Sequence, residues 1–200
     1  MRRFALLATA AAMTAASAAA VPAFAQTTVV SRAMPVTGNT PEVCTLQRAT
    51  LAQGSQVNFR ALTGNLLQID TLVDPATLAT NAASARIEFA AVCNFPHRIR
   101  LESQNNGLWQ TDGSMNQPAD GFAYALPYRA ELTWGEVNGA LDANANVRRI
   151  AERRFNVDQA TAGEVELRIL IEAGASNTRS NAPVLAGFYR DTLRIFLEPR

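Results

Sequence analysis

The chain has 200 residues, of which 48% are hydrophobic and 18% are charged, and its 18 basic and 17 acidic side chains give a net charge of +1. A balance so close to neutral provides no strong field for recruiting nucleic acid, so we expect no nucleic-acid partner. About 175 residues follow an N-terminal leader, and this length predicts one domain with a core of its own.

The leader, residues 1–25, has the pattern of a secretory signal peptide. Arg2 and Arg3 precede an Ala-rich apolar run, and the run ends in the small-x-small triplet at 23–25, which predicts cleavage before Gln26. The run is short and no basic stop follows it, which argues against a membrane anchor. We therefore expect export through the periplasm to the cell surface or extracellular space, with no stable membrane insertion after cleavage.

Two cysteines, Cys44 and Cys93, lie in the part that follows the leader. An even number of cysteines in an exported chain favours a disulfide between them. Zinc would require a closer cysteine pair and further ligands, whereas His97 is the only histidine, so we expect no metal. Closing a loop of about 50 residues should stabilise the fold by about 4 kcal/mol in the chain-entropy model.

Apolar residues then recur at every second position, which is the period of a strand with one buried face. The runs in chain order are 44–50, 55–62, 66–73, 86–93, 97–103, 124–134, 165–173 and 188–199. Turn signals separate them, at 74–75, 94–96, 106–107, 112–113, 120–121, 138–139 and 173–174. This pattern predicts an antiparallel β-sandwich or barrel. Pro127 interrupts one run and indicates a sheet edge or a bulge there.

Leu141–Phe155 departs from this period, because Val147, Ile150 and Ala151 recur at helical spacing. We expect a short helix or a long loop. Four arginines in this segment could bind an anion or an acidic polysaccharide, but nearby acids dilute their charge and favour a solvated surface. The arginines are Arg148, Arg149, Arg153 and Arg154, and the acids are Asp142, Glu152 and Asp158.

Few side chains suit catalysis. The chain has no lysine, and His97 falls in the apolar phase of its run, so we expect a partly buried histidine with its hydrogen bonds satisfied rather than a catalytic base. Two carboxylate pairs could be nominated for glycoside chemistry, Glu131 with Glu136 and Glu164 with Glu166. Both members of the second pair lie on a polar strand face. We therefore expect no enzyme and no cofactor.

Two tryptophans are candidates for ligand contact. Trp134 lies in phase with a core face, whereas Trp109 follows an Asn-Gly turn and is expected to be an exposed aromatic residue that could contact a ligand such as a sugar.

The order of these features resembles the spore coat protein U domain family, which includes pilin subunits of the archaic chaperone-usher type. The most specific part is the run Gly187, Tyr189, Asp191 and Thr192 before an alternating apolar strand. Cys44 and Cys93 match the family's disulfide pair, and the segment 167–174 matches the strand that precedes the tail. The resemblance covers roughly Cys44 to Pro199, so we divide the chain into 1–25 (signal peptide), 26–42 (extension) and 43–200 (domain).

The resemblance implies an all-β, immunoglobulin-like antiparallel sandwich that lacks its last strand and so leaves an apolar groove. Because the sequence ends at Arg200, soon after the last apolar run, we expect no further strand there. A neighbouring chain would supply it by β-strand addition. The implied groove-lining residues are Tyr189, Leu193, Ile195 and Leu197, and the implied donor residues, in the extension, are Val30, Met34 and Val36. Arg32 shares the donor face.

The function implied is that of a structural subunit of a secreted fimbria or coat, assembled by donor-strand exchange. Its partners would be other subunits, a periplasmic chaperone that covers the bare edge, and an outer-membrane usher. The alternative is a monomeric secreted adhesin or carbohydrate-binding sandwich that uses Trp109 and the turn loops.

Overall fold

The computed structural model describes residues 30–54, 56–111 and 120–200, and the chain divides into two units, Met1–Asn39 and Thr40–Arg200. Residues 30–39 of the first unit form no helix or strand, and their side chains are exposed. The signal peptide, its cleavage before Gln26 and the predicted turn at 112–113 lie outside the described residues.

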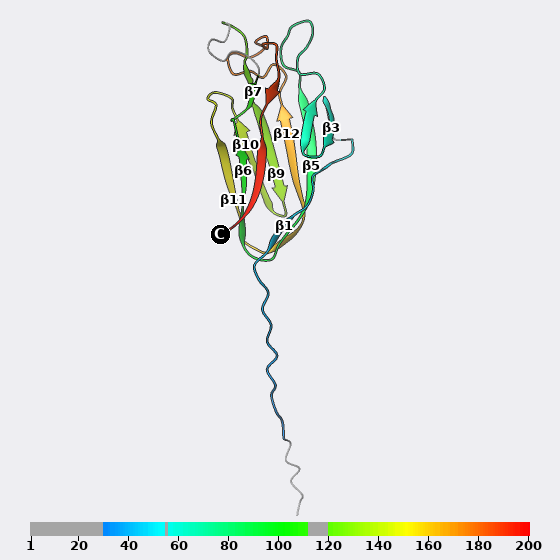
Figure 1. The fold of residues 1–200 in the computed structure, drawn as a ribbon, viewed down its shortest axis with the longest axis vertical. Coiled ribbons are helices and arrows are strands. Elements are labelled where there is room, and N and C mark those ends of the chain that lie inside the picture. The colour runs from blue at the N-terminus through cyan, green and yellow to red at the C-terminus, as the bar shows by residue number, and fades with distance from the viewer. Residues whose placement is uncertain (1–29, 55, 112–119) are drawn as a thin grey trace, which may run out of the picture. The chain divides into compact units, whose positions relative to one another are not determined.

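The described part of the second unit contains strands and no helix (Figure 1). In chain order the strands are β1 (Cys44–Leu46), β2 (Thr50–Leu51), β3 (Phe59–Thr63), β4 (Leu66–Ile69), β5 (Ala83–Cys93), β6 (His97–Ser103), β7 (Leu108–Gln110), β8 (Ala125–Leu126), β9 (Tyr128–Trp134), β10 (Val137–Ala143), β11 (Ala151–Val157), β12 (Thr161–Ile171), β13 (Tyr189–Arg190) and β14 (Leu193–Pro199). The predicted all-β class is confirmed.

Two antiparallel sheets enclose the main core. One has the order β1-β5-β12-β9-β10, with β2 also paired to β5, and the other has the order β11-β6-β14. Residues from both sheets share one apolar cluster, in which Ile99 and Leu101 of β6 meet Val165 of β12 and Leu132 and Trp134 of β9. The part β1-β5-β12-β9 corresponds to the A-B-E-D strands of an immunoglobulin-type sandwich and β6-β14 to the C-F strands, while β10 and β11 extend the two sheets on the same side. The predicted sandwich is therefore confirmed.

Alternation of apolar and polar residues explains the strands. In β12 the side chains of Val165, Leu167, Ile169 and Ile171 are buried, whereas Glu164 and Arg168 are exposed. In β6 the side chains of His97, Ile99 and Leu101 are wholly buried. The period of two thus placed one face of each strand in the core.

Pro127 marks the point at which the chain changes sheets. β8 ends at Leu126 and pairs with β7 in a small sheet of order β13-β7-β8, whereas β9 begins at Tyr128 in the large sheet. Proline has no N–H to donate to a ladder, so it suits this junction. The predicted interruption is confirmed.

The expectation of a helix or long loop at Leu141–Phe155 is wrong for most of that segment. β10 runs to Ala143, a loop of seven residues follows, and β11 begins at Ala151. β11 pairs along its whole length with β6, with Phe155 opposite Ile99. This pairing overrides the helical spacing of the apolar residues, a signal that rested on three positions only.

The predicted turn at 138–139 is also wrong, because Gly139 lies within β10 and the chain turns at Gly135-Glu136 instead. A Cβ atom at Gly139 would overlap the ring of Phe155 in β11. Glycine is therefore required here for close packing between strands of the two sheets. We call this side of the sandwich, formed by β10 and β11, the closed edge.

Candidate functional site: an apolar groove at the open edge

The opposite side of the sandwich, which we call the open edge, is formed by β14 of one sheet and by β1, β2 and the linker at 47–49 of the other. Seven residues of β14 pair with β6, from Leu193 opposite Ser103 to Pro199 opposite His97. Within the ranges that the structure describes, no strand pairs with the other side of β14. That side therefore leaves backbone N–H and C=O groups without a ladder partner, which makes it a template for another strand.

A groove of about 1030 Å³ lies beside this strand. Its lining from the large sheet includes Ile87 and Phe89 of β5 and Leu167, Ile169 and Ile171 of β12, and β14 contributes Leu193 and Ile195. These side chains belong to the main core or pack against it. The interior of the sandwich is thus accessible along this edge.

The hairpin formed by β3 and β4 provides a further wall. It is a two-stranded sheet of its own, and Phe59, Leu62, Leu67 and Ile69 line the groove. Asn58 fastens its base, because its side-chain amide donates to the carbonyl of Thr71 at 2.8 Å and its carbonyl accepts from the N–H of the same residue at 2.8 Å. The groove therefore has a wall anchored at one end.

Asp191 organises the end of the groove at which β14 begins. Its carboxylate accepts hydrogen bonds from the hydroxyls of Ser103 at 2.5 Å and Tyr128 at 2.7 Å, and from the N–H groups of Asn105 at 2.9 Å and Thr192 at 2.7 Å. The side-chain amide of Asn105 adds a fifth bond at 3.2 Å. Asp191 thus joins β6, β9 and the start of β14.

Tyr128 is a buried member of this network. Burial raises the pKa of its hydroxyl, and the nearby charge of Asp191 raises that pKa further, so Tyr128 stays neutral and donates to the carboxylate.

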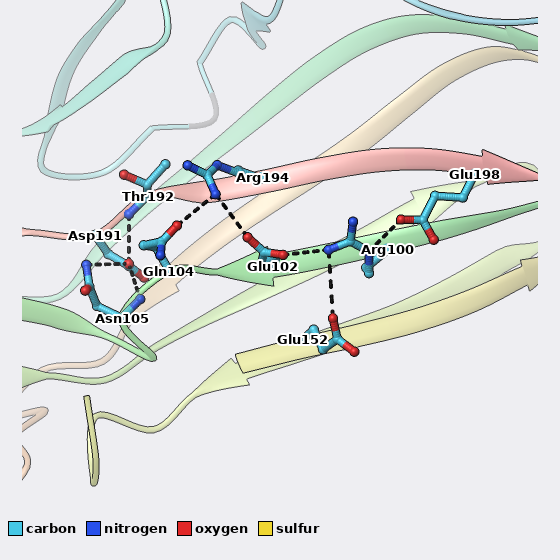
Figure 2. A network of polar contacts seen from close by, with 9 residues as sticks. All are labelled: Arg100, Glu102, Gln104, Asn105, Glu152, Asp191, Thr192, Arg194 and Glu198. Carbon is cyan, nitrogen blue, oxygen red and sulfur yellow. Dashed lines mark hydrogen bonds and ion pairs between the residues drawn. The ribbon is translucent and has the colours of Figure 1, made fainter. Parts of the chain in front are cut away.

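The outer face of the three-stranded sheet carries an ion-pair network that fixes β14 to β6 and β11 (Figure 2). Arg100 of β6 contacts Glu102 at 2.5 Å, Glu198 at 2.7 Å and Glu152 at 3.8 Å. Glu102, which is only 8% exposed, also accepts from Arg194 at 3.2 Å. Two cations thus compensate the buried carboxylate of Glu102.

The same network explains how β14 keeps its place with one neighbouring strand. The hydrogen bond that Arg100 donates to Glu198, together with the negative charge of Glu198, raises the pKa of Arg100. The guanidinium group of Arg100 also lies 3.8 Å from the centroid of the Phe196 ring. Contacts to both Phe196 and Glu198 hold the outer face of β14 against β6.

The predicted disulfide between Cys44 and Cys93 is confirmed. The two residues are register partners on β1 and β5, so the bond is a cross-strand link within the large sheet. Asn94 reinforces it, because its side chain accepts from the N–H of Val43 at 2.8 Å and donates to the carbonyl of Pro41 at 2.8 Å. The first strand is therefore fastened to the sheet.

His97 is buried beside this link. Its Nδ1 donates to the carbonyl of Phe95 at 2.8 Å, and its ring packs on Trp134 with centroids 4.8 Å apart. The prediction of a satisfied, partly buried histidine is confirmed only in part, because the side chain is wholly buried and its Nε2 has no hydrogen-bond partner among the described residues. The ligand atoms of Cys44, Cys93 and His97 lie within 4.8 Å of one another, but both sulfur atoms are in the disulfide and offer no thiolate.

Trp109 is not the exposed aromatic residue that was expected. Its side chain is 8% exposed, its Nε1 donates to the carbonyl of Asn105 at 2.6 Å, and its ring packs on Tyr124. The strand β7 turns the residue inward between β8 and β13. Trp134 is buried as predicted.

The remaining candidate residues do not come together in a common site. Glu131 pairs with Arg129 and Arg168, and Glu166 pairs with Arg86, so these carboxylates belong to ion pairs on strand surfaces. Glu136 and Glu164 are exposed. The four arginines of the β10–β11 region are exposed as well, namely Arg148, Arg149, Arg153 and Arg154. No described helix is long and apolar enough to span a membrane.

The residues expected to line the groove divide into two pairs. Leu193 and Ile195 line it, whereas Leu197 packs against the core elsewhere and Tyr189 packs against a separate cluster near Ala123. Sequence reasoning missed the hairpin wall and the role of Asp191. An aspartate inside an apolar strand run was a signal for the latter, since a carboxylate in such a place requires donors.

The fold is thus an immunoglobulin-type sandwich with one closed and one open edge. No model of a known protein family matches the chain, and no curated protein matches it.

Proposed function

We propose that this chain is a structural subunit of a surface fimbria or coat, and that it is joined to its neighbours by donor-strand exchange. The observation that carries the proposal is the apolar groove beside the unpaired side of β14. A groove lined by Ile87, Phe89, Leu193 and Ile195 suits alternate apolar side chains of an extended segment, and the bare strand offers that segment a hydrogen-bonding partner.

Residues 27–40 of this chain would act as a donor strand for a neighbouring subunit, with Val30, Met34 and Val36 on its apolar face. All three side chains are exposed, by 91%, 81% and 97%. Such a segment is available for another chain to bind.

Exposed apolar surface and a bare strand are aggregation hazards, which supports a need for a periplasmic chaperone and an outer-membrane usher. The disulfide supports export, because disulfides persist in oxidising compartments. We expect the chain purified without a chaperone or donor to self-associate. A stable monomer whose own N-terminal segment fills the groove would contradict the open-groove proposal.

The alternative of a carbohydrate-binding module loses the residue on which it rested, because Trp109 is buried and its indole N–H is used within the fold.

The test uses material sheared from the surface of cells that express the chain with its export machinery. Donor-strand assemblies dissociate slowly, so we expect ladders that resist sodium dodecyl sulfate. Deleting residues 27–40 should abolish these ladders. A control chain in which residues 27–40 are scrambled keeps the length and composition of the segment, and it should lose the ladders as well if the sequence of the donor strand is what matters. A monomer that retains a glycan and forms no ladder would overturn the proposal.

A further inference from the structure

The floor of the groove is apolar, but two arginine side chains in its lining are available to a strand that binds there. Among the residues that the structure describes, three charged ones line it, namely Arg48 from the linker between β1 and β2, Arg190 from β13, and Asp191. Both arginines are exposed, and in the described ranges neither guanidinium group has a hydrogen bond or ion pair with another residue. The two guanidinium groups are thus free to meet a charge on an incoming chain.

The one carboxylate among the described lining residues has no acceptor position left for an occupant. Asp191 already accepts five hydrogen bonds, from Ser103, Tyr128, Thr192 and twice from Asn105. Two carboxylate oxygens offer about four lone-pair positions, so this acceptor is saturated. An incoming strand therefore meets available donors from two cations and no available carboxylate.

The N-terminal segment of this chain is poorly matched to that lining. In the phase that places Val30, Met34 and Val36 on the groove, Arg32 faces it too. A third cation beside Arg48 and Arg190 adds like-charge repulsion, which disfavours a second copy of this chain as the occupant.

We propose, resting on the function proposed above, that the strand which fills this groove comes from a chain other than a second copy of this one, and that it brings a carboxylate to Arg48 or Arg190. Its alternate side chains are apolar and pack on the floor formed by β5, β12 and β14. The charge of the occupant thus selects which subunit follows this one, and the chain marks a junction between unlike subunits.

The test measures binding of labelled peptides to the full chain by fluorescence anisotropy. The peptides are residues 27–40 in native sequence, with Arg32→Leu, and with Arg32→Glu. We expect the Glu peptide to bind about two- to fivefold more tightly than the Leu peptide, which is the range of exposed ion pairs, and the native peptide to bind most weakly. In about 1 M salt, where screening acts within about 3 Å, the three affinities should converge.

Charge reversal in the groove identifies the residues responsible. In a chain carrying Arg48→Glu and Arg190→Glu, the order of the peptides should invert, so that the native peptide binds best. The control carries Arg149→Glu and Arg179→Glu, which change the net charge equally at exposed positions outside the groove lining, and it should keep the original order.

Equal affinities of the three peptides for the unmodified chain at low salt would overturn the charge proposal and leave the proposed function standing. The same holds if the order survives reversal of Arg48 and Arg190. If none of the peptides binds, the Leu variant included, the groove takes no strand of this kind and the proposed function fails as well.

Discussion

The two edges of the sandwich differ in how the space between the sheets is filled. At the closed edge, β10 and β11 belong to different sheets, and the ring of Phe155 fills the space above Gly139. At the open edge, β14 and β2 leave a groove of about 1030 Å³ between the sheets, and the described residues supply no strand to fill it. The gap is thus specific to one side, because the same fold packs tightly on the other.

The largest loss of stability should come from removing the disulfide that holds β1 at the open edge. Replacing Cys44 and Cys93 by serine removes a link that spans 49 residues, and should lower the free energy of unfolding by about 2–4 kcal/mol. Urea unfolding followed by tryptophan fluorescence measures this. Amide exchange should rise in β10 and β11 only by the loss of global stability, and should rise further in β1 because that strand also opens locally. An equal rise in all three strands would show that the disulfide does not hold β1 locally.

The next largest loss of stability should come from a substitution at the closed edge. Gly139→Val places methyl groups where the Phe155 ring lies, and should destabilise the domain by about 1–3 kcal/mol through overpacking. Gly38→Val is the matched control, because no heavy atom lies within 4 Å of a Cβ there. If the Gly139 variant matched this control, the closed edge would be looser than the packing indicates.

Asp191→Asn should cost about 1–2 kcal/mol, because a neutral amide accepts weaker hydrogen bonds and its NH2 group opposes the donors from Ser103 and Tyr128. Asp142→Asn, at an exposed ion pair with Arg129, is the control and should change stability little. An equal effect of both substitutions would mean that Asp191 does not organise the open edge.

The smallest effect appears only in alkali. The pKa of Tyr128 is raised in the folded chain, so the folded state holds its proton after the unfolded chain has lost it. Stability is unaffected below the unfolded pKa, near 10, and should fall above it by about 1.4 kcal/mol per pH unit. Tyr128→Phe should remove this slope between pH 10 and 11, as measured by urea unfolding at each pH. A slope unchanged in Tyr128→Phe would assign the loss to other groups.

Much of the fold could be predicted, because burial of one strand face imposes a period of two. Val165, Leu167, Ile169 and Ile171 show it without interruption, and all four side chains are buried. The strands β10 and β11 could not be predicted from the alternation of apolar residues. Its alternation is diluted by exposed arginines, and pairing with the distant β6 decides its structure.

The groove was predicted only in part. The alternation in β14 correctly placed Leu193 and Ile195, but a local pattern does not show which residues arrive from other strands. The hairpin wall and the network around Asp191 join residues far apart in the chain, such as Asp191 and Tyr128 at a separation of 63. The burial of Trp109 depends likewise on β8 and β13, which lie beside β7.

The disulfide has a mechanical consequence. A pull on the N-terminal segment enters the domain at β1, and the first residue of that strand is Cys44. The load therefore passes through a covalent bond to Cys93 and into β5, the strand held by β12 along eleven residue pairs. Tension on the segment before Cys44 cannot peel β1 away one hydrogen bond at a time, and it must instead shear the centre of the large sheet.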